Sequence, residues 1–128
     1  MRYLGVDYGK KKMGLAISEG VLASPLKVTG IRSLKDALVK THQIVKQEGV
    51  EKVVVGIPES GEAMKIAKEF SGQLKKSLIG IEVIEVEETL SSQAAKQQMV
   101  DLNISQKKRQ KEDAYAACLI LQDYIDSV

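Results

Sequence analysis

Three acidic residues far apart in the sequence have the types and surroundings of a metal-dependent active site. Asp7 closes one strand-like run, Glu88 follows another, and Asp113 precedes a helix rich in small residues. Three carboxylates gathered at one place repel each other unless a cation holds them, and their hard oxygen atoms suit Mg²⁺ or Mn²⁺. Such ions activate water and stabilise the leaving oxygen in phosphodiester cleavage. The spacing alone leaves open the alternative that these acids simply end strands or begin helices.

Other catalytic arrangements have little support in the sequence. His42 is the only histidine and falls inside a helical pattern, so no Ser-His-Asp arrangement forms at a strand end. Cys118 is the only cysteine and falls on an apolar helical stripe. We therefore expect no zinc cluster and no intrachain disulfide, and we interpret Cys118 as an inert core residue.

Two basic clusters are predicted to flank the acids and to bind a nucleic-acid backbone. The first follows Asp7 and the second precedes Asp113; their members are Lys10, Lys11 and Lys12, and Lys107, Lys108, Arg109 and Lys111. Charge runs usually face solvent, but flanking basic segments are also what a phosphate backbone requires. In a helix beginning after Ser105, the dipole would disfavour each cation of the second cluster by roughly 0.3–1 kcal/mol. We therefore predict that this helix begins near Glu112 or that the segment is a mobile loop.

The residues beside Asp7 allow two interpretations each. Gly9 and Gly14 either let the backbone approach a phosphate or supply a hairpin turn that needs a positive φ angle. Tyr8 either stacks on a base or packs against the protein, and packing is the commoner role of a tyrosine at a strand end.

An alternation of strands and helices positions these residues. Period-two or continuous apolar patterns predict strands over residues 2–7, 13–18, 21–30, 52–58 and 79–87. Period-3.6 patterns predict helices over 34–48, 61–77 and 91–101, and a last helix carrying an apolar stripe of Ala114, Ala117, Cys118, Leu121 and Ile125. Ser33 and Gly49 have the residue types of the caps of the first helix.

This order predicts an α/β fold with a mixed sheet and helices on both faces. Right-handed crossovers place strand 52–58 beside the first strand and strand 79–87 beyond it. Pro25 cannot donate to a ladder, so strand 21–30 is expected at an edge. Ligands of such sheets bind outside the carboxyl ends of the parallel strands, where Asp7 and Glu88 fall.

Length and composition limit the number of domains and the classes of function that are possible. The 128 residues predict one domain over 1–128, and the net charge of +2 does not by itself indicate a nucleic-acid partner. The sequence shows no signal-peptide pattern and no apolar run near the ~18 residues of a membrane span. We therefore expect a cytoplasmic protein; the sequence leaves its oligomeric state open.

Four segments in order resemble the YqgF family, small bacterial proteins also called RuvX-like and described as Holliday junction resolvases or pre-16S rRNA nucleases. The segments are DYGKKKMGLAIS, VVVGIPESG, ETLSSQAA and DAYAACLILQDYI. The resemblance implies an RNase H-like fold, a five-stranded sheet in the order β-β-β-α-β-α-β-α, and Mg²⁺- or Mn²⁺-dependent cleavage of an rRNA precursor or branched DNA. It also implies that the acidic positions of the family are Asp7, Glu88 and Asp113, and that its basic loop position is Lys11.

The sequence departs from this family pattern at Thr89, where the signature carries an arginine. The loss of that cation favours a second hypothesis, a nucleic-acid-binding or ribosome-maturation factor with little or no catalysis. The Asp-x-Gly hairpin also occurs in sugar kinases and actin-like ATPases, but those need two such domains and this chain has the length of one.

Overall fold

A computed structural model describes the backbone of residues 1–88 and 106–128 and the side chains of 1–88 and 114–128. Its elements, in chain order, are β1 (Tyr3–Tyr8), β2 (Lys12–Ser18), β3 (Ala23–Gly30), α1 (Leu34–Glu48), β4 (Lys52–Ile57), α2 (Gly61–Ser77), β5 (Glu82–Glu87) and α4 (Gln106–Ser127). The helix expected over 91–101 lies outside the described residues.

The strands form the mixed sheet that the sequence predicted. Their order is β3-β2-β1-β4-β5, with β3, β2 and β1 antiparallel and with β4 and β5 parallel to β1. β3 lies at an edge, as Pro25 indicated, and the register of the β2–β3 pair shifts between Leu15 and Ala16. The carboxyl ends of β1, β4 and β5 therefore meet at one end of the sheet.

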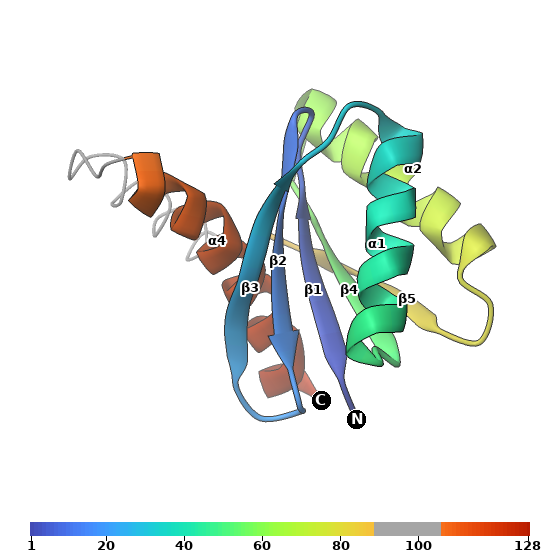
Figure 1. The fold of residues 1–128 in the computed structure, drawn as a ribbon, viewed down its shortest axis with the longest axis vertical. Helices are drawn as coiled ribbons and strands as arrows, with labels where there is room; N and C mark the ends of the chain where they lie inside the picture. Colours follow the sequence, from blue (N-terminus) through green and yellow to red (C-terminus); the bar gives the residue numbers. More distant parts are fainter. Residues whose placement is uncertain (89–105) are drawn as a thin grey trace.

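Helices cover both faces of this sheet (Figure 1). α1 and α2 pack on one face over a core that includes Leu4, Val6, Val53 and Phe70. α4 packs on the other face, where the expected small and apolar stripe is buried. Within the part of the chain that the structure describes, no helix combines the length and apolar composition that crossing a membrane would need.

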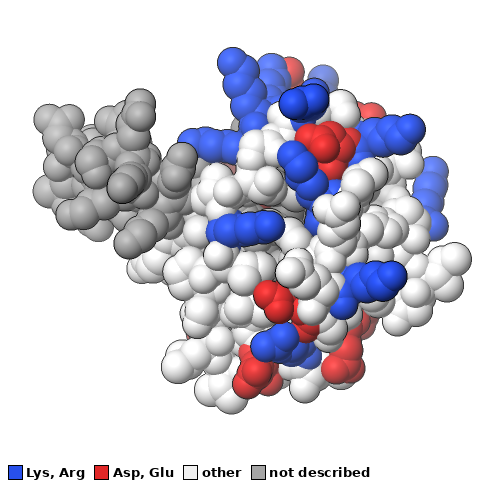
Figure 2. All heavy atoms as spheres, viewed as in Figure 1, with Lys and Arg blue, Asp and Glu red and all other residues white. Residues whose placement is uncertain are grey.

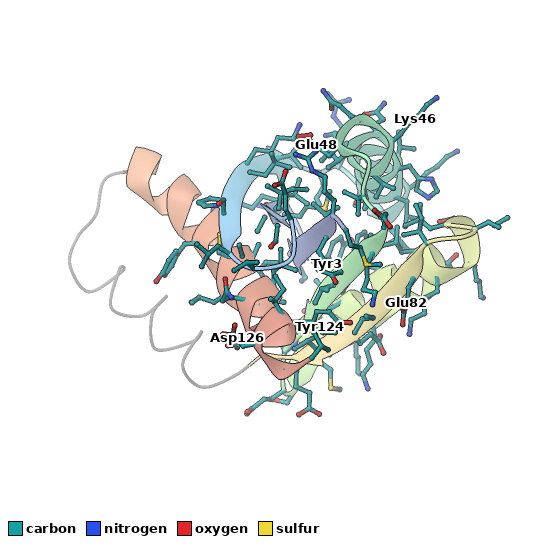
Figure 3. All side chains as sticks on the ribbon, turned by 90° about the horizontal axis from the view of Figure 1, so that it is seen from below. Tyr3, Lys46, Glu48, Glu82, Tyr124 and Asp126 are labelled. Atoms are coloured by element: carbon teal, nitrogen blue, oxygen red, sulfur yellow. The ribbon has the colours of Figure 1, made fainter. Side chains whose placement is uncertain are left out.

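The C-terminal end of α4 contacts the first residues of β1 and β4. The amino group of Lys52 donates to the Tyr124 hydroxyl at 3.2 Å, pairs with Glu82 at 3.3 Å, and lies 5.7 Å from the ring centroids of both Tyr3 and Tyr124. Figure 3 shows Tyr3, Tyr124 and Glu82 at this end of the sheet. The hydrogen bond with Tyr124, and then the one with Glu82, raises the pKa of Lys52. The end of α4 therefore lies over the beginning of β1.

The start of α4 differs from the prediction. The helix begins at Gln106, so the second basic cluster lies in its first two turns, and both alternatives, a later start near Glu112 and a mobile loop, are wrong. Gln, Lys and Arg have high helix propensity, and the packed C-terminal half supplies the tertiary contacts that stabilise most protein helices. Together these terms outweigh a dipole cost of roughly 0.3–1 kcal/mol per cation.

Ser71 of α2 gives a stability prediction. Its side chain is fully buried, and its hydroxyl has no hydrogen-bond partner among the described residues. Because an unsatisfied buried hydroxyl is costly and alanine favours helix, Ser71→Ala is expected to stabilise the protein by about 1 kcal/mol. Urea unfolding measures this. Ser77→Ala is the control, since that hydroxyl bonds to Leu74 and His42; a gain equal in both variants would contradict the assignment.

Candidate active site

Asp7 lies near the carboxyl end of β1 and on the face that α4 covers. Leu4 and Val6 point into the core beneath α1 and α2. Because side chains alternate along a strand, Gly5 and Asp7 face the other way. An added Cβ on Gly5 would lie 2.8 Å from the Ala117 carbonyl oxygen, which places α4 directly over this face of β1.

Two glycines flank Asp7 on the neighbouring strands. Gly14 of β2 is its cross-strand partner. On the other side Val55 of β4 pairs with Val6, so Gly56 comes one position further and lies beside Asp7. The sheet therefore carries no side chains immediately on either side of this carboxylate.

Glu88 lies beyond Gly56 on the same face. Its amide donates to the Ile57 carbonyl at 3.0 Å, which continues the β4–β5 pairing by one residue. Glu88 as a whole is only 9% exposed, and its Cγ lies 3.4 Å from the position of an added Cβ on Gly56. Ile120 of α4 packs over the same glycine. Asp7 and Glu88 thus share one face and one end of the sheet, with Gly56 between their strands.

The backbone of Asp113 belongs to α4, and its side chain lies outside the described residues. Tyr124 packs over Tyr3 and Ala117 over Gly5, so α4 runs from the carboxyl end of β1 toward its start. Position 113 is one helical turn before Ala117, toward the carboxylate end. The participation of Asp113 in the site remains a prediction.

The donor set suits a hard divalent cation. Asp7 and Glu88 offer carboxylate oxygens alone, the ligands that Mg²⁺ and Mn²⁺ prefer. Within residues 1–88 and 114–128 no group of three His, Cys, Asp or Glu side chains gathers at one place. A site with three carboxylates therefore depends on Asp113.

The first basic cluster lies in and beside the β1–β2 turn, next to Asp7. Lys10, Lys11 and Lys12 are exposed, and Lys10 pairs with Glu62 of α2. Gly9 does not have the positive φ angle proposed as one reason for it. Its amide instead donates to the Lys12 carbonyl at 3.0 Å, and an added Cβ would lie 2.8 Å from that oxygen. The glycine is required by a close contact within the turn.

The second basic cluster is placed only by its backbone. Lys107, Lys108, Arg109 and Lys111 belong to the first two turns of α4, and their side chains lie outside the described residues. Thr89, where the sequence departs from the family signature, also lies outside the described residues. The role of the cluster in binding remains a prediction.

Tyr8 packs within the protein. Its ring stacks on that of Phe70, with centroids 4.5 Å apart and planes 8° apart. Burial, and then the negative charge of Glu69, raises its pKa. Packing, the commoner of the two roles considered for Tyr8, is therefore the one observed.

Cys118 is buried against the sheet, and burial raises the pKa of its thiol from 9.0 to about 11. At pH 8 we expect the folded protein to react with iodoacetamide at least about 100-fold more slowly than the urea-unfolded chain, since the thiolate is the nucleophile. Because the folded pKa is the higher one, the contribution of this thiol to stability is complete below pH 9 and falls as the pH rises through 11. Equal alkylation rates of the folded and the urea-unfolded protein would contradict the expected protection of Cys118.

Comparison with known proteins supports the same assignment of fold and family. A family model described as "RuvX: Holliday junction resolvase" matches residues 1–127. A relative from Bacillus cytotoxicus named "Putative pre-16S rRNA nuclease" is 36% identical, with 99% of each chain covered.

Solved structures confirm the RNase H-like fold expected from the sequence. RuvC of T. thermophilus in complex with Holliday junction substrate aligns with a TM-score of 0.60 at 17% identity, covering 99% of this chain and 94% of that one. The fowlpox virus Holliday junction resolvase aligns with a TM-score of 0.60 at 15% identity, over the full length of both chains.

Proposed function

Because the chain belongs to the RuvX family of Holliday junction resolvases, we propose that it is a metal-dependent endonuclease with Asp7, Glu88 and Asp113 as its catalytic carboxylates. The observation that carries the proposal is that Asp7 and Glu88 lie on one face at one end of the sheet, on strands that flank Gly56. Adjacent strands are about 4.8 Å apart, so β1 and β5 are separated by roughly 10 Å. Two carboxylate side chains with a cation between them can span such a gap.

Mg²⁺ or Mn²⁺ would be held by these carboxylates, and when bound it supplies an activated water and charge stabilisation for phosphodiester hydrolysis. The protein contributes the placement of the ligands. The bond from the Glu88 amide to Ile57 fixes the start of the Glu88 side chain, and the packing of Ile120 over Gly56 closes the apolar side of the site.

The substrate is a nucleic acid whose backbone is bound by the two basic clusters. Lys11 and its neighbours are exposed beside Asp7, and the cations at the start of α4 belong to the element that carries Asp113. The names of the relatives indicate two substrates, an rRNA precursor and a Holliday junction. The family model carries the Holliday-junction name, but relatives that are 36% identical over nearly the whole chain are named for the rRNA precursor, so we propose that substrate first.

The alternative is a nucleic-acid-binding factor without catalysis, and one observation favours it. Thr89 replaces the arginine of the family signature directly after Glu88. Without that cation, the substrate phosphate next to the metal site loses one favourable charge interaction.

The two functions differ in what metal does to a labelled substrate. The protein is incubated with a 5′-extended rRNA precursor and with a four-way DNA junction, in Mn²⁺ and in EDTA. The nuclease predicts discrete cuts in one substrate that require Mn²⁺. Tight binding to both substrates without cuts in either condition would favour the binding factor.

A further inference from the structure

Two further cations, Arg32 and Lys35, lie beside the first basic cluster, at the start of α1. The Ile31 amide donates to the Lys11 carbonyl at 2.8 Å, which ties the β3–α1 connection to the β1–β2 turn. This hydrogen bond brings Arg32 and Lys35 near Lys11, although about twenty residues separate them in sequence. All three side chains are exposed. We call Lys11, Arg32 and Lys35 the α1-side cations.

The neighbouring acid, Asp36, cancels only one of the positive charges around it. Asp36 accepts a hydrogen bond from the Arg32 amide at 2.9 Å and pairs with Lys40 at 3.1 Å. The amide first, and then the Lys40 side chain, lowers the pKa of Asp36, so this acid is ionised and balances Lys40. The α1-side cations remain in excess, and Figure 2 shows Lys and Arg side chains gathered over this upper end of the molecule.

Arg32 and Lys35 share one end of the sheet with the carboxylates but lie on the opposite face, and Lys11 lies between them in the β1–β2 turn. Asp7 and Glu88 face α4, whereas Arg32 and Lys35 belong to the segment that begins α1 on the other face (Figure 1). A single-stranded nucleic acid bound at Asp7 and Glu88 would contact only the α4 side of this end of the sheet. In a double helix the two phosphate backbones are separated by grooves of about 6 and 12 Å, so the second strand can reach the α1 side of this end when the first lies at the carboxylates.

We propose that Lys11, Arg32 and Lys35 bind phosphates of the uncut strand of a double-helical substrate. The inference rests on the proposed function and adds to it that the preferred substrate is double-stranded next to the cut. Removing one cation that binds a phosphate is expected to reduce the slope of log affinity against log salt by roughly 0.9 for duplex DNA. Arg32 and Lys35 together therefore account for a slope change of about 2.

The test compares Arg32→Gln/Lys35→Gln with a matched control, Lys46→Gln/Lys76→Gln. The control removes the same charge from exposed lysines in the last turns of α1 and α2, away from the carboxylate end. Affinities for a fluorescent duplex and for a single strand of equal length are measured in EDTA over a range of salt, so that no cleavage is needed. Thermal unfolding of each variant verifies the fold.

The proposal predicts at least about tenfold weaker duplex binding by the first variant, a salt slope lower by about 2, and little change on the single strand or in the control. Equal losses of affinity on duplex and single strand, or equal losses in both variants, would overturn it. Suppose that Asp7→Asn abolishes metal-dependent cutting, while Arg32→Gln/Lys35→Gln and Lys46→Gln/Lys76→Gln bind the duplex equally well. Only this proposal then fails. If the wild-type protein cuts nothing but the duplex-specific loss is seen, the proposed catalysis fails and the binding surface stands.

Discussion

Asp7→Asn is expected to lower metal-dependent cleavage by at least about 100- to 1,000-fold while the protein stays folded. The change removes the charge that holds the cation and keeps the size of the side chain. Loss of charge stabilisation at a developing oxyanion commonly costs about 3–4 kcal/mol, which corresponds to this range. Asp7 lies between Gly14 and Gly56, so no neighbouring side chain on those strands replaces it. Initial cleavage rates in saturating Mn²⁺ measure the effect.

The chain offers a matched control at the second carboxylate. Glu88 and Glu87 are adjacent, but Glu88 is buried on the α4 face, whereas Glu87 is exposed and points the other way. Glu88→Gln is expected to lose activity as Asp7→Asn does, and Glu87→Gln to keep it within a few-fold. Equal activity of the Glu88→Gln and Glu87→Gln proteins would contradict the assignment of the site.

Gly5→Ala is expected to have the largest effect on stability. The added Cβ would lie 2.8 Å from the Ala117 carbonyl oxygen and 2.8 Å from the Leu121 Cβ, so helix backbone and strand must move apart. Overpacking of this kind costs about 1–3 kcal/mol and sometimes more. Because α4 carries Asp113, we also expect reduced cleavage. Urea unfolding measures the first effect, and the cleavage rate under native conditions measures the second.

Gly72→Ala provides the control for that substitution. Gly72 lies in α2 with nothing within 4 Å of an added Cβ. Alanine is the better helix former by about 1 kcal/mol, so this variant is expected to be as stable as the wild type or more so. A Gly5→Ala protein that unfolds at the same urea concentration as the wild type would contradict the observed docking of α4.

Local patterns predicted most of the fold because the signals that set it are local. Ser33 accepts the Asp36 amide as the N-cap of α1, and Gly49 ends that helix in the left-handed conformation, as their residue types indicated. The continuous apolar run of β4 predicted a strand covered on both faces, and Val53, Val54 and Val55 are fully buried. The parallel placement of β4 beside β1 followed from the handedness of the crossover.

The features that the sequence did not predict depend on contacts between distant residues. Gly5 and Gly56 are the positions where α4 approaches the sheet, and a glycine inside a strand is the signal that could have indicated this. Gln122 bonds to the Ala23 amide and the Val21 carbonyl, a contact that no local pattern encodes. The early start of α4 was missed because the dipole argument considered the charges and not the packing of the rest of the helix.

Only part of the arrangement of the candidate site was predicted from the sequence, and the roles of its residues remain predictions. The placement of Asp7 and Glu88 at one end of the sheet was predicted from strand order. Their common face was not predicted, and it became clear only from the alternation of side chains along β1 and β5 in the structure. The sequence pattern could not predict where Asp113 lies relative to Asp7 and Glu88. That position depends on where α4 crosses, and hence on the close contacts of Gly5 and Gly56.

The most direct test of the central claim is a crystal soaked in Mn²⁺ and measured at a wavelength where manganese scatters anomalously. The proposal predicts an anomalous peak bound by the Asp7 and Glu88 carboxylates, with the Asp113 carboxylate completing the set at distances of about 2.0–2.3 Å. A peak elsewhere, or none at this end of the sheet in saturating Mn²⁺, would contradict the proposed metal-dependent site.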